Sequence, residues 1–231
     1  KIKELYKTSP FGTVSMFCTG FLHPVIFTMG AVYGALMNFS ILEISLYLSL
    51  ITISGAIFQW PIGYLSDRFD RRIIMIITAL LGSIFSAICF FSVSESPDFI
   101  NLSSDWKIIF QHITNHRLIF YIFISLYAGM CLPLFSLNLA YVNDFLPKEK
   151  FVSAGAGSQL IFGLSAMTAP FLCSFFIKEL GPNGFFIFLF IFQTIIGLFG
   201  IYRMTRRSTE ENPDNTFTPL PRNITPVGIQ L

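Results

Sequence analysis

Long apolar stretches separated by short polar connections dominate the chain. Six of them are long enough to cross a bilayer, which takes about 20 mostly apolar residues in a helix. Only helices and closed barrels can cross lipid, and barrel strands are segments of roughly ten residues with alternating polarity. The pattern therefore predicts an all-α integral membrane protein, a six-transmembrane-helix bundle over residues 11–205. The predicted spans lie near 11–37, 44–65, 73–93, 118–142, 152–177 and 185–203.

Basic residues are distributed unequally between the two sets of connections. Twelve of the 15 Lys and Arg residues lie before the first span, after the second, after the fourth or after the sixth. The other three are Lys107, Arg117 and Lys178. Because cytoplasmic loops carry the excess of Lys and Arg, both termini are predicted to be cytoplasmic. The chain is then a multi-pass protein, with the bacterial cytoplasmic (inner) membrane as its expected location.

Three segments lie outside the predicted spans. Residues 1–10 are charged and end in Ser-Pro, which is typical of a cytoplasmic linker that follows an earlier domain. Residues 206–231 are polar and contain several prolines, which predicts a flexible cytoplasmic tail. The outer loop 94–117 is predicted to hold a short amphipathic helix at the membrane interface, with a ligand-gating loop as the alternative. Four of its residues recur at helical spacing: Trp106, Ile109, Phe110 and Ile113.

The composition agrees with a membrane domain and excludes other classes. Hydrophobic residues make up 53% of the chain and charged residues 12%, where soluble domains carry about a quarter charged residues. Disordered, coiled-coil and nucleic-acid-binding chains are excluded on this ground. The cysteines have neither zinc-site nor disulfide-framework spacing, so we expect small buried side chains and no metal or cofactor. They are Cys18, Cys89, Cys131 and Cys173.

The prolines divide the six spans into two triplets. In each triplet the first two spans contain one proline each and the third contains none; the four are Pro24, Pro61, Pro133 and Pro170. Because three is odd, the second triplet crosses the membrane in the opposite direction to the first. This predicts two inverted three-helix repeats, an arrangement found in secondary transporters. The proline-free third and sixth spans are expected on the outside of the bundle, facing lipid.

One motif lies in the connection between the second and third spans. Residues 63–72 read Gly-Tyr-Leu-Ser-Asp-Arg-Phe-Asp-Arg-Arg. This resembles the G-x-L-[SA]-D-R-x-G-R-[RK] signature of the major facilitator superfamily of transporters, with Asp70 in place of the usual glycine. A basic loop that only follows the positive-inside rule would not require this order of residues. Gly63 permits close helix approach or an unusual backbone angle. The basic residues Arg68, Arg71 and Arg72 can pair with Asp67 and Asp70, or with anionic head groups.

The resemblance implies an architecture and a role for the motif. In that superfamily two six-helix bundles flank a central cavity, and the loop with this motif latches the cytoplasmic side of the outward-open state. The chain then corresponds to one half, the carboxy-terminal one, and a second six-helix bundle is expected from upstream sequence. The stretches Asn143-Asp144-Phe145-Leu146 and Gly181-Pro182-Asn183-Gly184 are similar to the YcaD-like branch of the superfamily.

The first and fourth helices of each bundle line the superfamily's cavity, and here these are 11–37 and 118–142. His23 is an ionisable residue inside a span, which makes it a functional candidate, and it titrates in the range needed to carry a coupling proton. The alternative is a neutral histidine bonded to a carbonyl freed by Pro24. Tyr33 and Gln159 are further polar candidates.

The fourth span carries a polar face. Tyr127, Asn138 and Tyr141 recur with Cys131 and Leu134 at spacings of three and four, which places them on one side of a helix. Such a face suits either a cavity wall or hydrogen bonding between helices, and the pattern does not decide between them.

The function implied by the resemblance is transport of a small solute by alternating access. This chain would be one half of a secondary active or facilitative transporter. Asp, Glu, Lys and Arg are absent from the middle of the spans, so this half favours a neutral or amphipathic solute. The alternatives are a non-transporting sensor or scaffold and an intramembrane enzyme. The sequence contains neither the G-x-S-G element of a serine protease nor H-E-x-x-H.

Overall fold

The computed structural model describes residues 2–94 and 106–206, and each regular element within those ranges is helical. As predicted, six helices in these ranges are long and apolar enough to cross a membrane. The four cysteines are buried and unpaired, as predicted. The crossing helices are α2 (Pro10–Leu36), α3 (Ile41–Arg68), α4 (Arg71–Ser94), α5 with α6 (together Leu118–Asn143 in the span), α7 (Phe151–Leu180) and α8 (Gly184–Arg206).

Two segments differ in detail from the prediction. The linker region contains a short helix, α1 (Ile2–Thr8), and a one-turn helix, η2 (Lys148–Lys150), precedes α7. Helix α5 begins at Trp106 and runs to Cys131, so the helix expected in the outer loop continues into the fourth span. Its side chains up to residue 117, residues 95–105 and the tail from 207 onward lie outside the described residues.

The fourth span is interrupted at Leu132–Pro133, between α5 and α6 (Leu134–Asn143). A proline has no N–H to continue the helical hydrogen bonds, and its ring displaces the preceding turn. Other helix ends follow equally local rules. Ser40 and Glu43 form a capping box at the start of α3, with Ser40 N donating to Glu43 Oε2 over 2.7 Å. Gly181 ends α7 with a φ of 77°.

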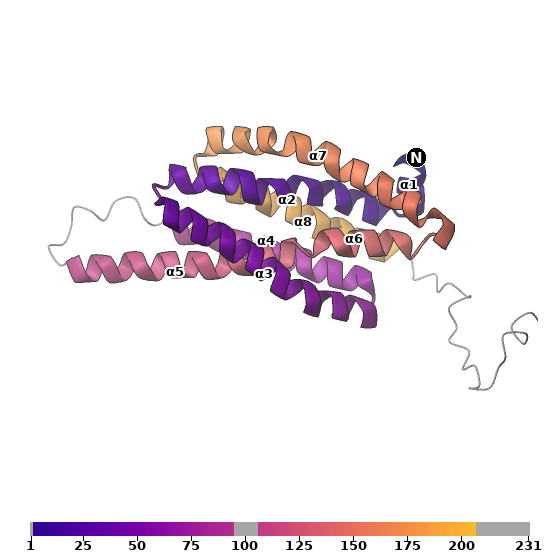
Figure 1. Ribbon diagram of the computed structural model, residues 1–231, viewed down its shortest axis with the longest axis horizontal. Helices are drawn as coiled ribbons and strands as arrows, with labels where there is room; N and C mark the ends of the chain where they lie inside the picture. The colour runs from indigo at the N-terminus through magenta and orange to yellow at the C-terminus, as the bar shows by residue number, and fades with distance from the viewer. Residues whose placement is uncertain (1, 95–105, 207–231) are drawn as a thin grey trace, which may run out of the picture.

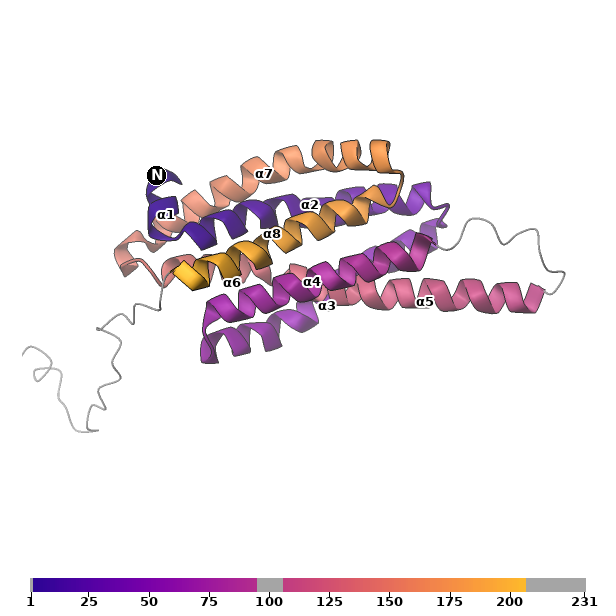
Figure 2. The same ribbon diagram turned by 180° about the vertical axis from the view of Figure 1, so that it is seen from behind.

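The helices pack in a pattern that relates the two triplets. Helix α2 packs on α7 while α3 packs on α5, and α8 packs on α2 while α4 packs on α5. The first helix of each triplet (α2 or α5) thus packs on the second and third helices of the other triplet, as two repeated units require. The start of α1, the α3–α4 turn, the α6–α7 connection and the end of α8 lie at one end of the bundle (Figures 1 and 2).

The bundle has two unlike faces. Helices α4 and α8 pack against each other on one side (Figure 2), and on the other α2 and α6 lie between α3 and α7 (Figure 1). In α3 and α7 only 22% of the most apolar window is buried, against 44% or more in the other spans. These two helices therefore present apolar surface that this six-helix bundle leaves uncovered.

Gly20 should be needed for the packing of α2 on α7. A Cβ added there would meet Ser165 Oγ and lie 2.6 Å from the backbone oxygen of Phe162. Because that oxygen belongs to the backbone of α7, the clash is relieved only if the two helices move apart. We expect Gly20→Ala to cost about 1–3 kcal/mol and to lower the melting temperature of the full-length protein in detergent. The matched control is Gly163→Ala, whose Cβ would meet nothing within 4 Å. Equal melting temperatures for the two variants would contradict this.

Candidate functional site

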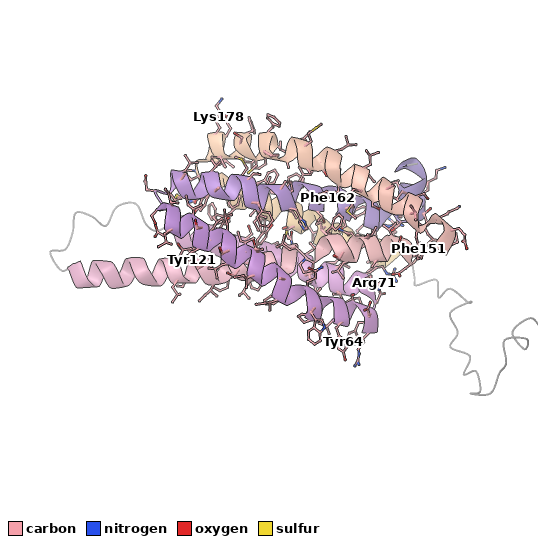
Figure 3. The ribbon with its side chains drawn as sticks, in the orientation of Figure 1. Tyr64, Arg71, Tyr121, Phe151, Phe162 and Lys178 are labelled. Atoms are coloured by element: carbon pink, nitrogen blue, oxygen red, sulfur yellow. The ribbon has the colours of Figure 1, made fainter. Side chains whose placement is uncertain are left out.

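A pocket of about 370 Å³ opens on the face that contains α2, α3, α6 and α7. Its polar groups are one imidazole, two carboxamides and one hydroxyl, and the rest of its lining is apolar or aromatic. We call it the glutamine pocket. Phe162, at its α7 side, lies between α7 and α2 (Figure 3). The lining residues are His23, Gln59, Leu132, Phe135, Ser136, Gln159 and Phe162.

His23 reaches from α2 to the break in the fourth span. Its Nε2 lies 3.1 Å from the carbonyl oxygen of Cys131, and a carbonyl can only accept, so Nε2 carries the proton. In the neutral ring Nδ1 is then an acceptor. The ring packs edge-on against Phe162 at a centroid distance of 5.8 Å. His23 is thus bonded to a carbonyl, but to one beside Pro133 on another helix rather than one freed by Pro24.

The structure separates the candidate residues into two groups. His23 and Gln159 line the glutamine pocket. The other four are buried in the bundle: Tyr33, Tyr127, Asn138 and Tyr141. The Nδ2 of Asn138 donates to Thr19 Oγ1 over 3.0 Å, a bond from α6 to α2. The predicted polar face of the fourth span therefore lies toward the helix bundle and not toward the pocket.

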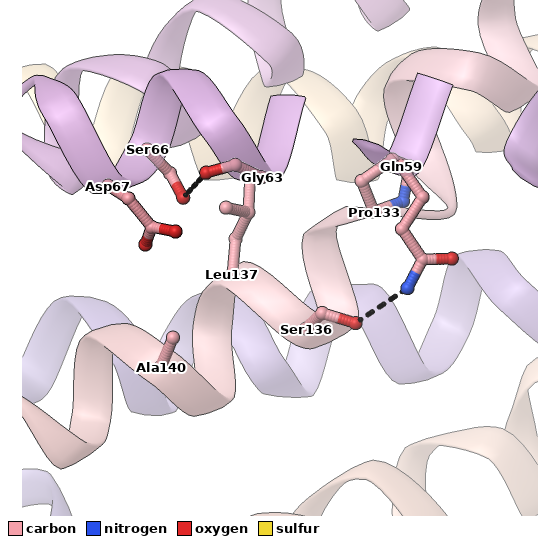
Figure 4. Close-up of a pocket in the computed structure, with 8 residues that line it drawn as sticks. All are labelled: Gln59, Gly63, Ser66, Asp67, Pro133, Ser136, Leu137 and Ala140. Carbon is pink, nitrogen blue, oxygen red and sulfur yellow. Dashed lines mark hydrogen bonds between the residues drawn. The ribbon is translucent and has the colours of Figure 1, made fainter. Parts of the chain in front are cut away.

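Gln59 and Ser136 are pocket residues whose place in a pocket was not predicted from the sequence. Gln59 Nε2 donates to Ser136 Oγ over 3.3 Å, joining α3 to α6. Both line a second pocket of about 180 Å³, which we call the latch-side pocket because it ends at Asp67 (Figure 4). Its other lining residues are Gly63, Ser66, Pro133, Leu137 and Ala140. Gln59 can be recognised in the sequence as a polar residue within an apolar span. The sequence does not show which neighbouring helix its side chain meets.

Arg71 is the centre of the charged motif. Its Nη2 donates to Asp67 Oδ1 over 2.9 Å, and its Nη1 donates to the two carboxylate oxygens of Asp144 over 2.7 and 2.8 Å. Asp67 lies at the end of α3, Arg71 starts α4 and Asp144 follows α6. Arg71 thus ties the two triplets together at the end of the bundle that carries the basic connections (Figure 3).

The other charged residues of the motif have local roles. Asp70 accepts a hydrogen bond from the backbone N–H of Arg72 over 2.9 Å and pairs with its guanidinium over 3.0 Å. It therefore caps α4, which explains a carboxylate at this position. The guanidinium of Arg68 lies 4.3 Å above the ring of Tyr64. A Cβ at Gly63 would meet nothing within 4 Å, so no close helix contact is described there.

Asp144 is a partner of Arg71 that lies outside residues 63–72 and was not predicted from them. It lies in the loop after the fourth span, 73 residues from Arg71. Burial raises the pKa of Asp144, the Arg71 guanidinium opposes that rise, and the nearby carboxylates Asp67 and Asp70 add to it. As the pH falls, Asp144 therefore loses its charge, and with it the ion pair to Arg71, at a higher pH than an exposed aspartate would.

The comparisons with known proteins agree with this geometry. The sequence model of the Major Facilitator Superfamily matches residues 8–229. The chain belongs to the major facilitator superfamily. It is 24% identical over 191 residues to an "Uncharacterized MFS-type transporter YfkF" of Bacillus subtilis (strain 168). The match covers 81% of this chain and 43% of the relative, so the chain spans less than half of that protein's length. No solved structure matches.

Membership in the major facilitator superfamily confirms the resemblance read from residues 63–72. It makes the chain an integral multi-pass membrane protein of a transporter family and points to transport rather than enzymatic catalysis. The six helices are those of one half of a major facilitator fold. Assignment to the YcaD-like branch stays a prediction.

Proposed function

We propose that the full-length protein carries a small solute by alternating access and that this chain supplies one wall of its cavity. The observation that carries the proposal is the position of the glutamine pocket. It opens on the face whose flanking helices, α3 and α7, leave apolar surface uncovered. A second six-helix bundle placed over that face would cover both helices and turn the pocket into a central cavity.

The membrane orientation follows from the charges. The end of the bundle with the Arg71 latch carries the α3–α4 and α6–α7 connections and both described chain ends (Figure 1). These two connections, the segment before α2 and the sequence from Arg203 onward together hold twelve of the 15 Lys and Arg residues, which supports a cytoplasmic position in a bacterial inner membrane. The linker 1–10 and the tail 206–231 are then cytoplasmic, and the latch controls the cytoplasmic side of the cavity.

The chemistry of the pocket indicates what the solute presents to this half. The two carboxamides and the Ser136 hydroxyl both donate and accept hydrogen bonds, and neutral His23 offers Nδ1 as an acceptor. The aromatic rings beside them suit an apolar part of the solute. An uncharged or amphipathic solute fits this wall, and His23 is our candidate for a coupling proton. The proposal involves no metal, cofactor or nucleic acid.

An uptake screen tests the proposal. Full-length protein in proteoliposomes is supplied with a uniformly ¹³C-labelled extract of neutral metabolites, with and without a proton gradient, and the vesicle contents are measured by mass spectrometry. We expect at least one compound to redistribute in protein-containing vesicles and not in empty ones. No redistribution in either direction would contradict transport and favour a sensor or scaffold. A new chemical product would favour an intramembrane enzyme.

A further inference from the structure

Gln59 and Ser136 form the partition between the two pockets. They are the two residues common to both linings, and the hydrogen bond between them crosses from α3 to α6 (Figure 4). On one side of that bond lie His23 and Gln159. On the other side lies Asp67, which is bonded to Arg71. The bond therefore stands between the candidate solute site and the charged latch.

On the side of the partition away from Asp67, residues 54–58 of α3 pack tightly against the fourth span. Ser54 Oγ donates to the backbone oxygen of Ser125. A Cβ added at Gly55 would collide with the side chain of Leu132, and one added at Gly129 would lie 2.7 Å from the ring of Phe58. Such contacts resist separation, because moving the helices apart would leave a void.

On the Asp67 side of the partition, α3 and α6 are only loosely packed against each other. Helix α3 packs along α5 but barely against α6. The latch-side pocket separates them, lined there by the small residues Gly63 and Ala140. Each segment also follows a proline, Pro61 within α3 and Pro133 before α6. Because prolines weaken the helical hydrogen bonds around them, residues 62–68 and 134–143 are the parts of these helices best able to swing. Arg71 joins their far ends through Asp67 and Asp144.

We propose that Gln59, together with Ser136, is a positioning pair that couples the glutamine pocket to the Arg71 latch. The biological meaning rests on the proposed transport function. A solute that hydrogen-bonds to the Gln59 carboxamide competes with Ser136, which releases α3 from α6 at the level of the two prolines. The segment that carries Asp67 can then move away from α6. Because coupling between two sites is reciprocal, the state of the latch also alters the glutamine pocket when no solute is bound.

A cysteine at Ala140 reports on the latch-side pocket. The reporter is placed in the full-length protein without other reactive cysteines, and the rate of alkylation by N-ethylmaleimide is measured. The native cysteines of this chain are buried. Losing one exposed hydrogen bond shifts such an equilibrium by about threefold, so Gln59→Leu and Ser136→Ala should each raise the rate by that factor. The double variant should be no faster than either single one.

The matched control is Gln159→Leu, which removes the other carboxamide of the same pocket but reaches neither α6 nor the latch in the described bonds. We expect it to leave the Ala140→Cys rate unchanged. An equal effect of Gln159→Leu would overturn the proposal, because a general change in the pocket would then explain the result. Unchanged rates for Gln59→Leu and Ser136→Ala, or effects that multiply in the double variant, would overturn it as well.

The reciprocal measurement uses a cysteine at Gln159 as the reporter. Arg71→Gln, which opens the latch, should change the alkylation rate of the cysteine at position 159 when Gln59 is present. In a Gln59→Leu background, Arg71→Gln should leave that rate unchanged. A change of the same size in both backgrounds would mean that the coupling bypasses Gln59 and would overturn the proposal. Neither measurement uses a transported solute. A failed uptake screen and a failed coupling experiment are therefore separate results.

Discussion

Replacing Arg71 by Gln should slow transport by the full-length protein by about tenfold, because Arg71 makes charge-assisted bonds to two carboxylates. The variant leaves Asp67 and Asp144 without the cation that lies between them, and the two like charges then repel each other. Since the latch lies away from the glutamine pocket, equilibrium binding of the solute found in the uptake screen should remain largely intact. The measurement compares initial transport rate with equilibrium binding for the same variant.

Arg68→Gln is the matched control for this prediction. It makes the same change of charge in the same loop, but the Arg68 guanidinium stacks on Tyr64 and forms no ion pair in the described part of the chain. We expect a much smaller loss of rate. Asp67→Asn should resemble Arg71→Gln in kind, with binding preserved. Normal transport by Arg71→Gln, or a defect confined to lost binding, would show that the motif is not a latch.

Replacing His23 by Ala should weaken solute binding by about tenfold, since the solute loses the hydrogen bond that Nδ1 can accept. The change removes both the bond to the Cys131 carbonyl and a ring that packs against Phe135 and Phe162. It should leave the alkylation rate of Ala140→Cys unchanged, because His23 makes no described bond to the latch. Binding and alkylation are measured on the same preparation.

His23→Gln separates the structural role of this side chain from proton coupling. Glutamine can still donate to the Cys131 carbonyl but does not titrate. If His23 carries the coupling proton, the variant should bind the solute and lose the dependence of transport on pH and on a proton gradient. A His23→Gln protein with unchanged pH dependence would remove His23 from coupling and leave it a structural bond between α2 and the α5–α6 break.

The latch shows how far a local motif can predict a site. Residues 63–72 were sufficient to predict that Asp67 pairs with a nearby arginine, Arg71 or Arg72, and the structure shows that the partner is Arg71. The second partner could not be predicted in the same way. Asp144 comes from 73 residues further along, and no periodicity within the loop relates the two. Only the packing of α6 beside α4 brings them together.

The polar residues of the spans show the same limit. Helical spacing predicts Tyr127, Asn138 and Tyr141 on one face of the fourth span, but spacing does not tell which neighbour a face meets. Packing directs that face into the bundle, where Asn138 bonds to Thr19. Gln59 was equally visible as a polar residue in an apolar span. Its place at the junction of two pockets depends on where α6 begins after Pro133.

The most direct test of a cavity on this face is the accessibility of a cysteine at Ser136 from each side of the membrane. Full-length protein is labelled with a membrane-impermeant maleimide in right-side-out and inside-out vesicles, and cysteines at Lys150 and Lys178, at opposite ends of α7, calibrate the two sides. We expect Ser136→Cys to be labelled from both sides, and Arg71→Gln to increase its labelling from the Lys150 side and decrease it from the other. Protection from both sides, or labelling that Arg71→Gln does not shift, would contradict an alternating cavity on this face.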